Sequence, residues 1–421
     1  MRIGFISTRF FGTDGVSLEA AKWVHVLEQD LEHECFWFAG QLDTPAERSH
    51  LCELAFFEHP EIFILQRTLF GLKHDRPPEI SALVKRLKCQ IKDELRAFIE
   101  KFQIDVLVPQ NIFAIPMNVP LGLALKELIE ETPIPTIAHH HDFVWERGRF
   151  HHTSADDYLE DAFPPSFTDR FQHVVINSMA VGSLQERKGV PSTVVPNVFD
   201  FETPPEIDES YSRDFRAEAE IGEDEIVVLQ PTRIVPRKGI ELSIELLDQL
   251  QQTNGKKYCL LVSHRAGDEG FEYQDMLIRL AKQRGVRVIW FGDRIGHEHG
   301  ETEEGKRIYR LWDIYPHADL VTYPSIYEGF GNAFLEAVYF RKPVVVNRYQ
   351  VYIDDIEPCG FKTVTLEGAV DAGVVERTRF LLETPDLAKQ WCDHNYEVAL
   401  KHFSYATLKR KLSALVEKAQ S

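Results

Sequence analysis

Two carboxylates lie close together in one segment of the chain's second half. Glu328 and Glu336 both lie in 324–336, which follows the apolar run at 319–323, and seven residues separate them. Gly329 and Gly331 let successive backbone amides point at one ligand. Carboxylates accept hydrogen bonds from hydroxyl groups, so one is a candidate to meet a sugar and the other to accept two ribose hydroxyls. Helix capping explains single residues of this segment but not the whole set.

A basic cluster follows another predicted strand. Thr232–Gly239 comes after the apolar run at 226–231 and contains Arg233 and Lys238. These two cations can reach one diphosphate together with the dipole of the helix that follows. A basic surface turn is the alternative. It is the weaker one because the chain is acidic, with 47 Lys and Arg against 66 Asp and Glu.

A glycine-containing turn follows the first predicted strand. Gly12 and Gly15 lie in Thr8–Ser17, between that strand and a predicted helix. Glycine lets backbone approach a ligand closely, and a helix N-terminus favours an anion. The turn therefore predicts a binding role, with a purely geometric turn as the alternative.

Three consecutive histidines follow the strand predicted at 134–138. His139, His140 and His141 on extended backbone point to alternating sides, so they cannot easily hold one metal ion together. We therefore predict no metal site. The favoured interpretation is a polar edge of a binding site, at the end of this strand, where imidazoles and Asp142 face a ligand.

Arginines accompany both of these loops in the first half of the chain. Arg147 and Arg149 come shortly after the histidines, and Arg9 precedes the glycine turn. A guanidinium fork suits a phosphate or a carboxylate, so these side chains are candidates for clamping an anionic group. For Arg147 and Arg149 the alternative is a solvated loop.

The elements that must position these residues alternate between short apolar strands and amphipathic helices. Such alternation implies parallel sheets covered by helices on both faces, and ligands then lie at the carboxyl ends of the strands. We predict an α/β protein of two doubly wound, Rossmann-like domains facing a cleft. The predicted strands are 3–7, 34–38, 104–109, 134–138, 173–177, 226–231, 259–264, 286–292, 319–323 and 343–346. The predicted helices include 16–29, 238–251, 271–284, 304–315 and 331–341.

A proline-rich, acidic stretch divides the two halves. We predict an N-terminal Rossmann-like domain at 1–200, a linker at 201–222 and a C-terminal Rossmann-like domain at 223–395. A C-terminal helical segment completes the chain at 396–421.

Composition excludes several classes of partner. The net charge of −19 disfavours nucleic acid and anionic membranes, which require a basic surface. The six cysteines show no CxxC spacing, which is typical of reduced thiols, and no apolar run approaches the ~20 residues of a membrane span. We see no signal peptide and expect a cytoplasmic protein without a membrane partner. Its oligomeric state cannot be predicted from the sequence.

These residues resemble the retaining GT-B glycosyltransferases of family four, also called group 1. The resemblance rests on Arg233 and Lys238, on the PSxxEGFGxxxLEA stretch at 324–337, and on a histidine at the end of strand 134–138. It implies that Arg233 and Lys238 neutralise the donor's diphosphate as it leaves. It also implies that Glu328 lies beside the transferred sugar as a catalytic group and that Glu336 binds the ribose hydroxyls.

The resemblance assigns the remaining candidates to donor or acceptor. His141 best matches a catalytic cleft histidine, although its two histidine neighbours leave the register open. The further donor-binding candidates are Gly15, Arg294 in the turn 292–294, and the backbone at Gly329, Phe330, Gly331 and Asn332. The acceptor-binding candidates are Arg9, Asp142, Arg147 and Arg149.

Donor and acceptor follow less directly. UDP-glucose is favoured as the donor by its frequency in the family, and the arginines favour a small phosphorylated or carboxylated acceptor. A sucrose-phosphate synthase, which joins UDP-glucose to fructose 6-phosphate, is therefore the first expectation. The alternatives are a mannosyl- or glucosyltransferase that makes a glycerate-based or other glycoside and a non-catalytic nucleotide-sugar-binding protein. We expect no cofactor and no obligatory metal, because Arg233 and Lys238 supply the positive charge and the chain contains no DxD motif.

Overall fold

The structure is a computed structural model that describes residues 1–12, 14–71, 75–267 and 270–420. Thr13, which falls in the predicted turn after the first strand, lies outside these residues. The chain divides into two compact units. Unit 1 comprises Met1–Asn197 and Tyr405–Ser421, and unit 2 comprises Val198–Ser404.

Unit 1 is built on a parallel sheet of seven strands. They are β1 (Arg2–Ile6), β2 (Glu34–Ala39), β3 (Ser49–Leu51), β4 (Val106–Pro109), β5 (Thr136–His140), β6 (Phe171–Val175) and β7 (Ser192–Val194). The strand order is β3-β2-β1-β4-β5-β6-β7, so the direction of winding reverses between β1 and β4. Most of these strands are apolar and buried because helices cover both faces of the sheet.

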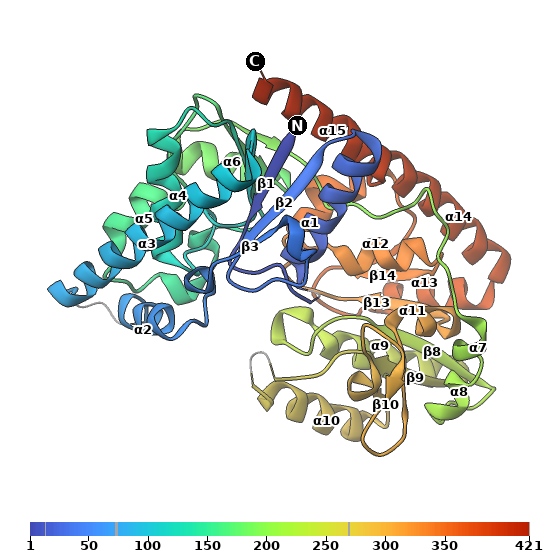
Figure 1. The fold of residues 1–421 in the computed structure, drawn as a ribbon. Helices are drawn as coiled ribbons and strands as arrows, with labels where there is room; N and C mark the ends of the chain where they lie inside the picture. The colour runs from blue at the N-terminus through green and yellow to red at the C-terminus, as the bar shows by residue number, and fades with distance from the viewer. Residues whose placement is uncertain (13, 72–74, 268–269, 421) are drawn as a thin grey trace. The chain divides into compact units, whose positions relative to one another are not determined.

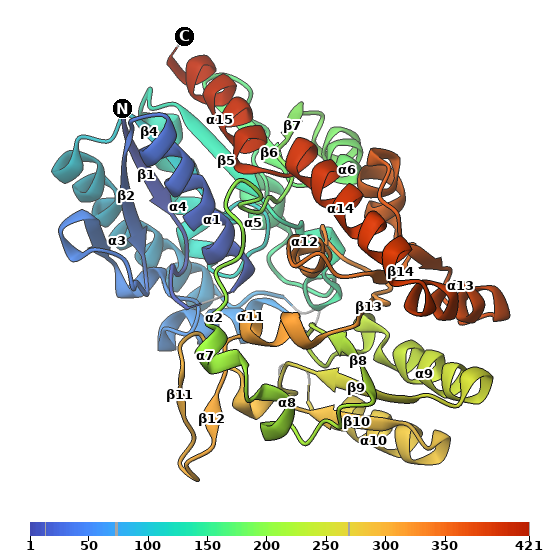
Figure 2. The same cartoon turned by 90° about the vertical axis from the view of Figure 1, so that its right-hand side faces the viewer.

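The helices of unit 1 include one from the far end of the chain. They are α1 (Gly15–His25), α2 (Pro60–Leu69), α3 (Pro78–Phe102), α4 (Val119–Glu131), α5 (Asp156–Ala162), α6 (Ser178–Lys188) and α15 (Tyr405–Gln420). A π-helical turn, Val26–Asp30, extends α1. Helix α15 packs against α1, this turn and β5 (Figure 2). Gln172 and Lys411 fasten it through hydrogen bonds to the carbonyls of Leu415 and Val194, at 2.8 and 2.7 Å.

Unit 2 repeats the same plan with six parallel strands. They are β8 (Glu225–Gln230), β9 (Lys257–Val262), β10 (Arg287–Trp290), β13 (Leu320–Tyr323), β14 (Val344–Asn347) and β15 (Val364–Leu366). The order is β10-β9-β8-β13-β14-β15, and the winding reverses between β8 and β13 (Figure 1). The longer helices are α9 (Ile240–Asn254), α10 (Glu272–Arg284), α12 (Asn332–Tyr339), α13 (Ala372–Glu383) and α14 (Pro385–His402).

The predicted helix at 304–315 is wrong over most of its length. A two-stranded antiparallel hairpin of β11 (Gly300–Glu301) and β12 (Arg307–Ile308) occupies this region, and only α11 (Leu311–Ile314) is helical. Gly305 has a φ of +74°, a conformation that ends a helix and favours a turn. The predicted linker at 201–222 contains two helical turns, α7 (Glu209–Ser212) and α8 (Phe215–Glu218), and Phe215 is fully buried in unit 2.

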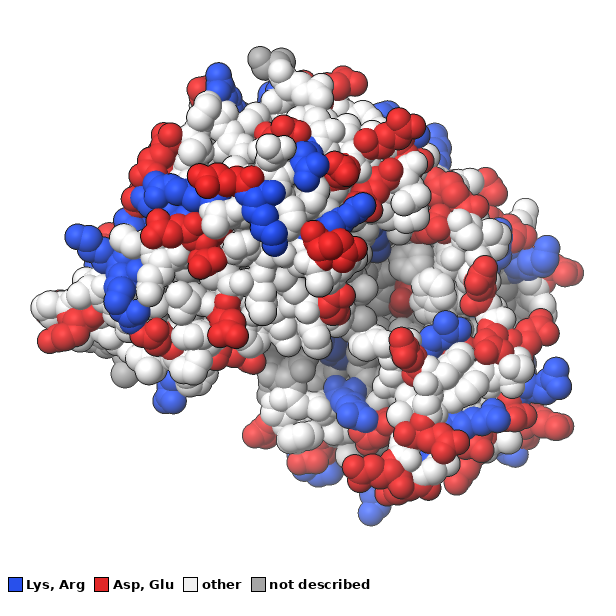
Figure 3. All heavy atoms as spheres, in the orientation of Figure 1, with Lys and Arg blue, Asp and Glu red and all other residues white. Residues whose placement is uncertain are grey.

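The fold class, membrane-spanning helices and surface charge were each the subject of an expectation from the sequence. Two doubly wound units confirm the predicted fold class. No helix among the described residues is long and apolar enough to cross a membrane. On the face that Figure 3 shows, Lys and Arg atoms are interspersed with Asp and Glu atoms.

Candidate active site

The reversal point of unit 2 brings together the two segments that the sequence singled out. Strands β8 and β13 are neighbours, so the residues that follow them share one edge of the sheet. The amide of Ile326 donates a hydrogen bond of 2.8 Å to the carbonyl of Arg237. Gly239 has a φ of +60°, and a Cβ there would lie 2.5 Å from the carbonyl oxygen of Pro324. Glycine is therefore required for the two loops to approach this closely.

Lys238 and Glu328 form a buried ion pair at this edge. The Nζ of Lys238 bonds to Oε1 of Glu328, and their side chains are only 10% and 9% exposed. Arg237 donates to Oε2 of the same carboxylate at 3.1 Å and to the carbonyl of Tyr327 at 3.1 Å. Glu328 thus accepts from two cations, one on each carboxylate oxygen.

The pKa values of this pair follow from burial and from the surrounding cations. Burial works to raise the pKa of Glu328, but Lys238 and Arg237 outweigh it, so the pKa lies below its ordinary value. Burial lowers the pKa of Lys238, with Arg237 and Arg233 adding to the effect and Glu328 opposing it. Arg233 is exposed, and it is close enough to Lys238 to influence its charge. The structure therefore gathers three cations and one ionised carboxylate at the reversal point.

The segment after Glu328 is held by a tyrosine. Tyr349 donates a hydrogen bond of 2.8 Å to the carbonyl of Phe330. Gly331 has a φ of +137°, and a Cβ there would lie 2.3 Å from the Tyr349 hydroxyl. Helix α12 then begins at Asn332, so its first amides lie next to the loop that carries Glu328. This is the arrangement in which backbone amides bind a phosphate or sugar hydroxyls.

Glu336 and Arg294 occupy different surroundings. Glu336 is partly exposed on α12 and accepts a hydrogen bond of 2.9 Å from the hydroxyl of Tyr315. Arg294 donates at 2.6 Å to the carboxylate of Glu218 and at 3.0 Å to the carbonyl of Arg307. The structure thus gives Arg294 a role in fastening the hairpin, and nucleotide binding by Arg294 stays a prediction.

The three histidines of unit 1 separate into two buried rings and one that is partly exposed. His139 and His140 lie at the end of β5 and are 1% and 2% exposed, whereas His141 is the first residue after the strand and is partly exposed. Gln110 joins the two rings that share a face. Its Oε1 lies 2.9 Å from Nδ1 of His139 and 3.2 Å from Nε2 of His141. His140 points the other way, 3.0 Å from His173.

Burial controls the ionisation of these rings. It lowers the pKa of His141 to about 4, with Asp142 and Asp14 opposing the shift. His141 is therefore neutral at pH 7, and Gln110 holds its orientation. A neutral imidazole can donate one hydrogen bond and accept another. Among the described residues, no group of three or more His, Cys, Asp or Glu side chains is arranged to hold a metal ion.

Three other predicted residues of unit 1 form ion pairs within the unit. Asp142 accepts from Asn111 at 3.0 Å and forms an ion pair with Arg147, whose side chain is half exposed. Arg9 lies 3.3 Å from a carboxylate oxygen of Asp14.

Two further residues complete the predicted set in unit 1. Gly15 is the first residue of α1, next to the capping residue, and a Cβ at this position would meet no atom within 4 Å. Arg149 donates to the sulfur of Met117 at 2.7 Å and lines a cavity.

Sequence reasoning missed three residues that organise these sites. Arg237 was visible in the basic cluster, yet its pairing with Glu328 depends on the contact between two loops that are distant in sequence. Gln110 and Tyr349 carried no signal, because a single amide and a single hydroxyl beyond a strand are common. Both act by holding a predicted residue or loop in place.

Comparison with known proteins identifies the family. The sequence profile of the family described as "Glycosyl transferases group 1" matches residues 212–397. The chain is 35% identical over 445 aligned positions to the mannosylglucosylglycerate synthase of Thermotoga maritima, covering 98% of this chain and 99% of that protein. The chain belongs to the group 1 glycosyltransferases. The mannosylglucosylglycerate synthase of Petrotoga mobilis is also 35% identical, over 87% of this chain and 86% of that protein.

Solved structures match the fold across both units. HepE of Anabaena, crystallised with UDP and glucose, aligns with a TM-score of 0.66 at 15% identity over 99% of this chain and 100% of that one. A sucrose-phosphate synthase from Thermosynechococcus elongatus aligns with a TM-score of 0.63 at 15% identity, over 99% and 98% of the two chains. The group 1 glycosyltransferase thus has the predicted GT-B fold and is an enzyme that transfers a sugar from a nucleotide-sugar donor.

Proposed function

We propose that this glycosyltransferase transfers mannose, with retention of anomeric configuration, from a nucleotide-mannose to a small soluble glycoside of glycerate. The observation that carries the proposal is the similarity to two mannosylglucosylglycerate synthases, one of them matched over almost the whole chain. That product contains mannose, glucose and glycerate, so a single mannose transfer to glucosylglycerate would complete it.

This proposal replaces the first expectation from the sequence. UDP-glucose and fructose 6-phosphate were favoured by frequency and by the arginines of unit 1, and a carboxylate accounts for those arginines as well as a phosphate does. The sucrose-phosphate synthase shares the fold at 15% identity, whereas the glycerate-glycoside synthases share 35%. The glycerate alternative is therefore the better supported acceptor class.

The cations of unit 2 provide the main electrostatic contribution to the proposed reaction. As the bond between the sugar's C1 and the phosphate oxygen breaks, the leaving nucleoside diphosphate keeps the electron pair. Arg233 and Lys238 would stabilise that growing negative charge, aided by the amides at the start of α12. Positive charge develops on the sugar at the same time, and the ionised Glu328 would stabilise it. These fixed cations would make a metal ion unnecessary, so we expect chelation by EDTA to leave the rate unchanged.

The departing phosphate of the donor accepts the proton of the acceptor's hydroxyl group. An acceptor hydroxyl would attack C1 on the face from which the diphosphate departs, and the departing phosphate oxygen would take the hydroxyl proton. This route gives retention without a covalent sugar–enzyme bond. Glu328 would act by charge and by positioning Lys238, to which it is bonded.

The test is a transfer assay with paired donors and acceptors. GDP-mannose, UDP-glucose and ADP-glucose are each incubated with glucosylglycerate, glycerate and fructose 6-phosphate. Products are then identified by mass spectrometry, and the new anomeric centre by NMR. We expect a mannosylated glucosylglycerate with the donor's anomeric configuration. Sucrose phosphate as the only product, or inversion at the anomeric carbon, would overturn the proposal.

A further inference from the structure

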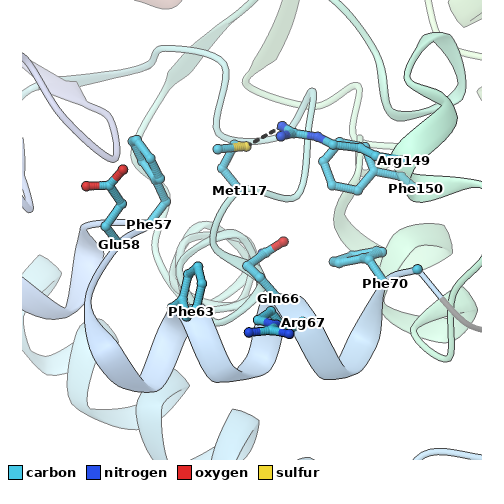
Figure 4. A pocket seen from close by; sticks show the side chains of 10 residues that line it. Phe57, Glu58, Phe63, Gln66, Arg67, Phe70, Met117, Arg149 and Phe150 are labelled. Atoms are coloured by element: carbon cyan, nitrogen blue, oxygen red, sulfur yellow. Dashed lines mark hydrogen bonds between the residues drawn. The ribbon is translucent and has the colours of Figure 1, made fainter. Parts of the chain in front are cut away.

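A cavity of about 440 Å³ opens in unit 1. Its lining combines aromatic, charged and amide side chains from three segments (Figure 4). The lining residues are Phe57, Glu58, Phe63, Gln66, Arg67, Phe70, Gly71, Met117, Arg149 and Phe150. Its volume falls in the range of small-molecule sites, roughly 300–1,000 Å³.

The walls of this cavity are phenyl rings. Phe70 and Phe150 pack edge to face with ring centres 5.0 Å apart. Phe63 on α2 is 50% exposed, although it is a large apolar side chain. Phe57 lies on the other side of Phe63 from Phe70 in Figure 4. An apolar wall that remains open to solvent is typical of a ligand site, and aromatic faces pack well against the C–H groups of a sugar ring.

Two arginines at this cavity have no carboxylate partner among the described residues. Arg149 donates to the thioether of Met117 at 2.7 Å, which is a weak acceptor, and its guanidinium lies 4.5 Å from the centre of the Phe150 ring. Burial and the neighbouring Arg147 lower the pKa of Arg149, and Asp142, which forms its ion pair with Arg147, opposes the shift. Arg67 contacts the ring of Phe63, at 5.8 Å from its centre.

Other arginines of the same unit show the contrast. Arg76 forms two hydrogen bonds of 2.7 Å with Asp157, and Arg147 pairs with Asp142. The carboxylate of Glu58 also lines the cavity, but neither Arg67 nor Arg149 forms an ion pair with it in the described part of the chain. Two arginines that line one cavity without an ion pair are complementary to an anionic ligand.

The cavity also presents an acceptor for hydroxyl groups. Gln66 donates through Nε2 to the carbonyl of Pro116 at 2.6 Å. That hydrogen bond fixes the amide so that its oxygen points into the cavity (Figure 4). The combination of phenyl walls, a guanidinium and a fixed amide oxygen suits a sugar that carries an acid group.

The position of the cavity in the sheet supports a substrate role. Met117 lies in the segment after β4, and Arg149 and Phe150 lie in the segment after β5. Both segments leave the carboxyl edge of the sheet, where doubly wound folds bind ligands. His141 begins the second of these segments, so the cavity and this histidine belong to the same edge of unit 1.

We propose that this cavity binds the acceptor, with its carboxylate at Arg149 and a sugar ring against Phe63 and Phe70. The proposal rests on the proposed function for the identity of the acceptor. It adds Phe63, Gln66 and Arg67 to the acceptor site, and none of these was visible from the sequence.

The experiment compares the binding of three ligands to the wild type and to three variants. Binding of glucosylglycerate, of its uncharged amide and of glucose 6-phosphate is measured by calorimetry on the full chain. The proteins are the wild type, Arg149→Gln, Phe63→Ala and the control Arg410→Ala. Arg410 lies exposed on α15, outside the cavity, and its variant reports the effect of removing a positive charge from the same unit. Circular dichroism and thermal unfolding of the full chain show that each variant is folded.

Loss of one charge-assisted hydrogen bond in this partly exposed cavity should raise the dissociation constant of the ligand roughly tenfold. We expect the wild type to prefer the acid over the amide by about that factor, and Arg149→Gln to bind both equally. Phe63→Ala should weaken acid and amide by the same factor, and Arg410→Ala should resemble the wild type. Equal acid preference in Arg149→Gln and the wild type, or tighter binding of glucose 6-phosphate than of glucosylglycerate, would overturn the assignment.

The two proposals fail in different ways. If the wild type forms no mannosylated product with any glycerate glycoside, the proposed function fails. If it forms the product while Arg149→Gln keeps the wild-type preference for the acid, the proposed function stands and the cavity is not the acceptor site.

Discussion

Replacing Glu328 by glutamine separates the two roles of this residue, because it removes a charge and preserves shape. In the structure Glu328 neutralises Lys238 and Arg237 at once, with the Lys238 and Glu328 side chains only 10% and 9% exposed. Removing one partner of a buried pair leaves an uncompensated charge, at a cost of about 3–5 kcal/mol. Arg237 is 30% exposed and can turn towards water, so we expect the lower end, about 3 kcal/mol.

That loss should be visible in thermal unfolding. For a unit of this size, about 3 kcal/mol corresponds to a fall in Tm of roughly 6–12 °C. Lys238→Met should destabilise the protein less, because Glu328 keeps its hydrogen bond from Arg237 at 3.1 Å.

Adding a nucleoside diphosphate should reverse which of the two variants has the lower Tm. In Glu328→Gln the diphosphate supplies the missing negative charge, so GDP or UDP should raise its Tm more than it raises that of the wild type. In Lys238→Met the cation itself is gone, and the nucleotide should stabilise less. Turnover should fall in both variants, with nucleotide affinity lost only in Lys238→Met. Differential scanning fluorimetry with and without nucleotide measures each effect. Equal nucleotide-induced shifts in all three proteins would refute this reasoning.

Two further predictions concern backbone fit and pH. Gly239→Ala should lower both stability and nucleotide affinity, because its Cβ would meet the Pro324 carbonyl at 2.5 Å. The matched change Gly255→Ala, at a similar φ of +65° with no atom within 4 Å, should cost only ~1–2 kcal/mol and leave nucleotide affinity intact. Acidification should destabilise unit 1, because burial lowers the pKa of His141 and of His173 from 6.5 to about 4. The unfolded chain therefore takes up protons first, so stability is complete above pH 6.5 and is lost as the pH falls towards 4. A Tm that stays constant from pH 7 to pH 5 would contradict this account.

The parallel architecture could be predicted because it depends on local sequence. Apolar strands such as 226–231 and 319–323 are recognisable alone, and the residues after them are where such folds bind ligands. The hairpin at 300–308 was mistaken for a helix because two-residue strands leave almost no apolar period. The return of α15 to unit 1 depends on packing across most of the chain's length, which no local pattern encodes.

The residue types of the candidate site could be predicted from the sequence, but the ion pair that two of them form with each other could not. Lys238 and Glu328 were each expected to face a ligand, and the structure shows them bonded to each other. The sequence left the register of the histidines open. The structure shows that β5 ends at His140 and that His141 is the first residue beyond the strand, and a catalytic role for His141 stays a prediction. The cavity proposed for the acceptor includes Phe63 and Gln66 from a helix that contains no chemical motif.

The central claim is that the reversal point of unit 2 binds the donor's diphosphate. A crystal structure of the enzyme with GDP tests it most directly. We expect the diphosphate within hydrogen-bond distance of Arg233 and Lys238 and the ribose hydroxyls at Glu336. A diphosphate bound away from both cations would contradict the account.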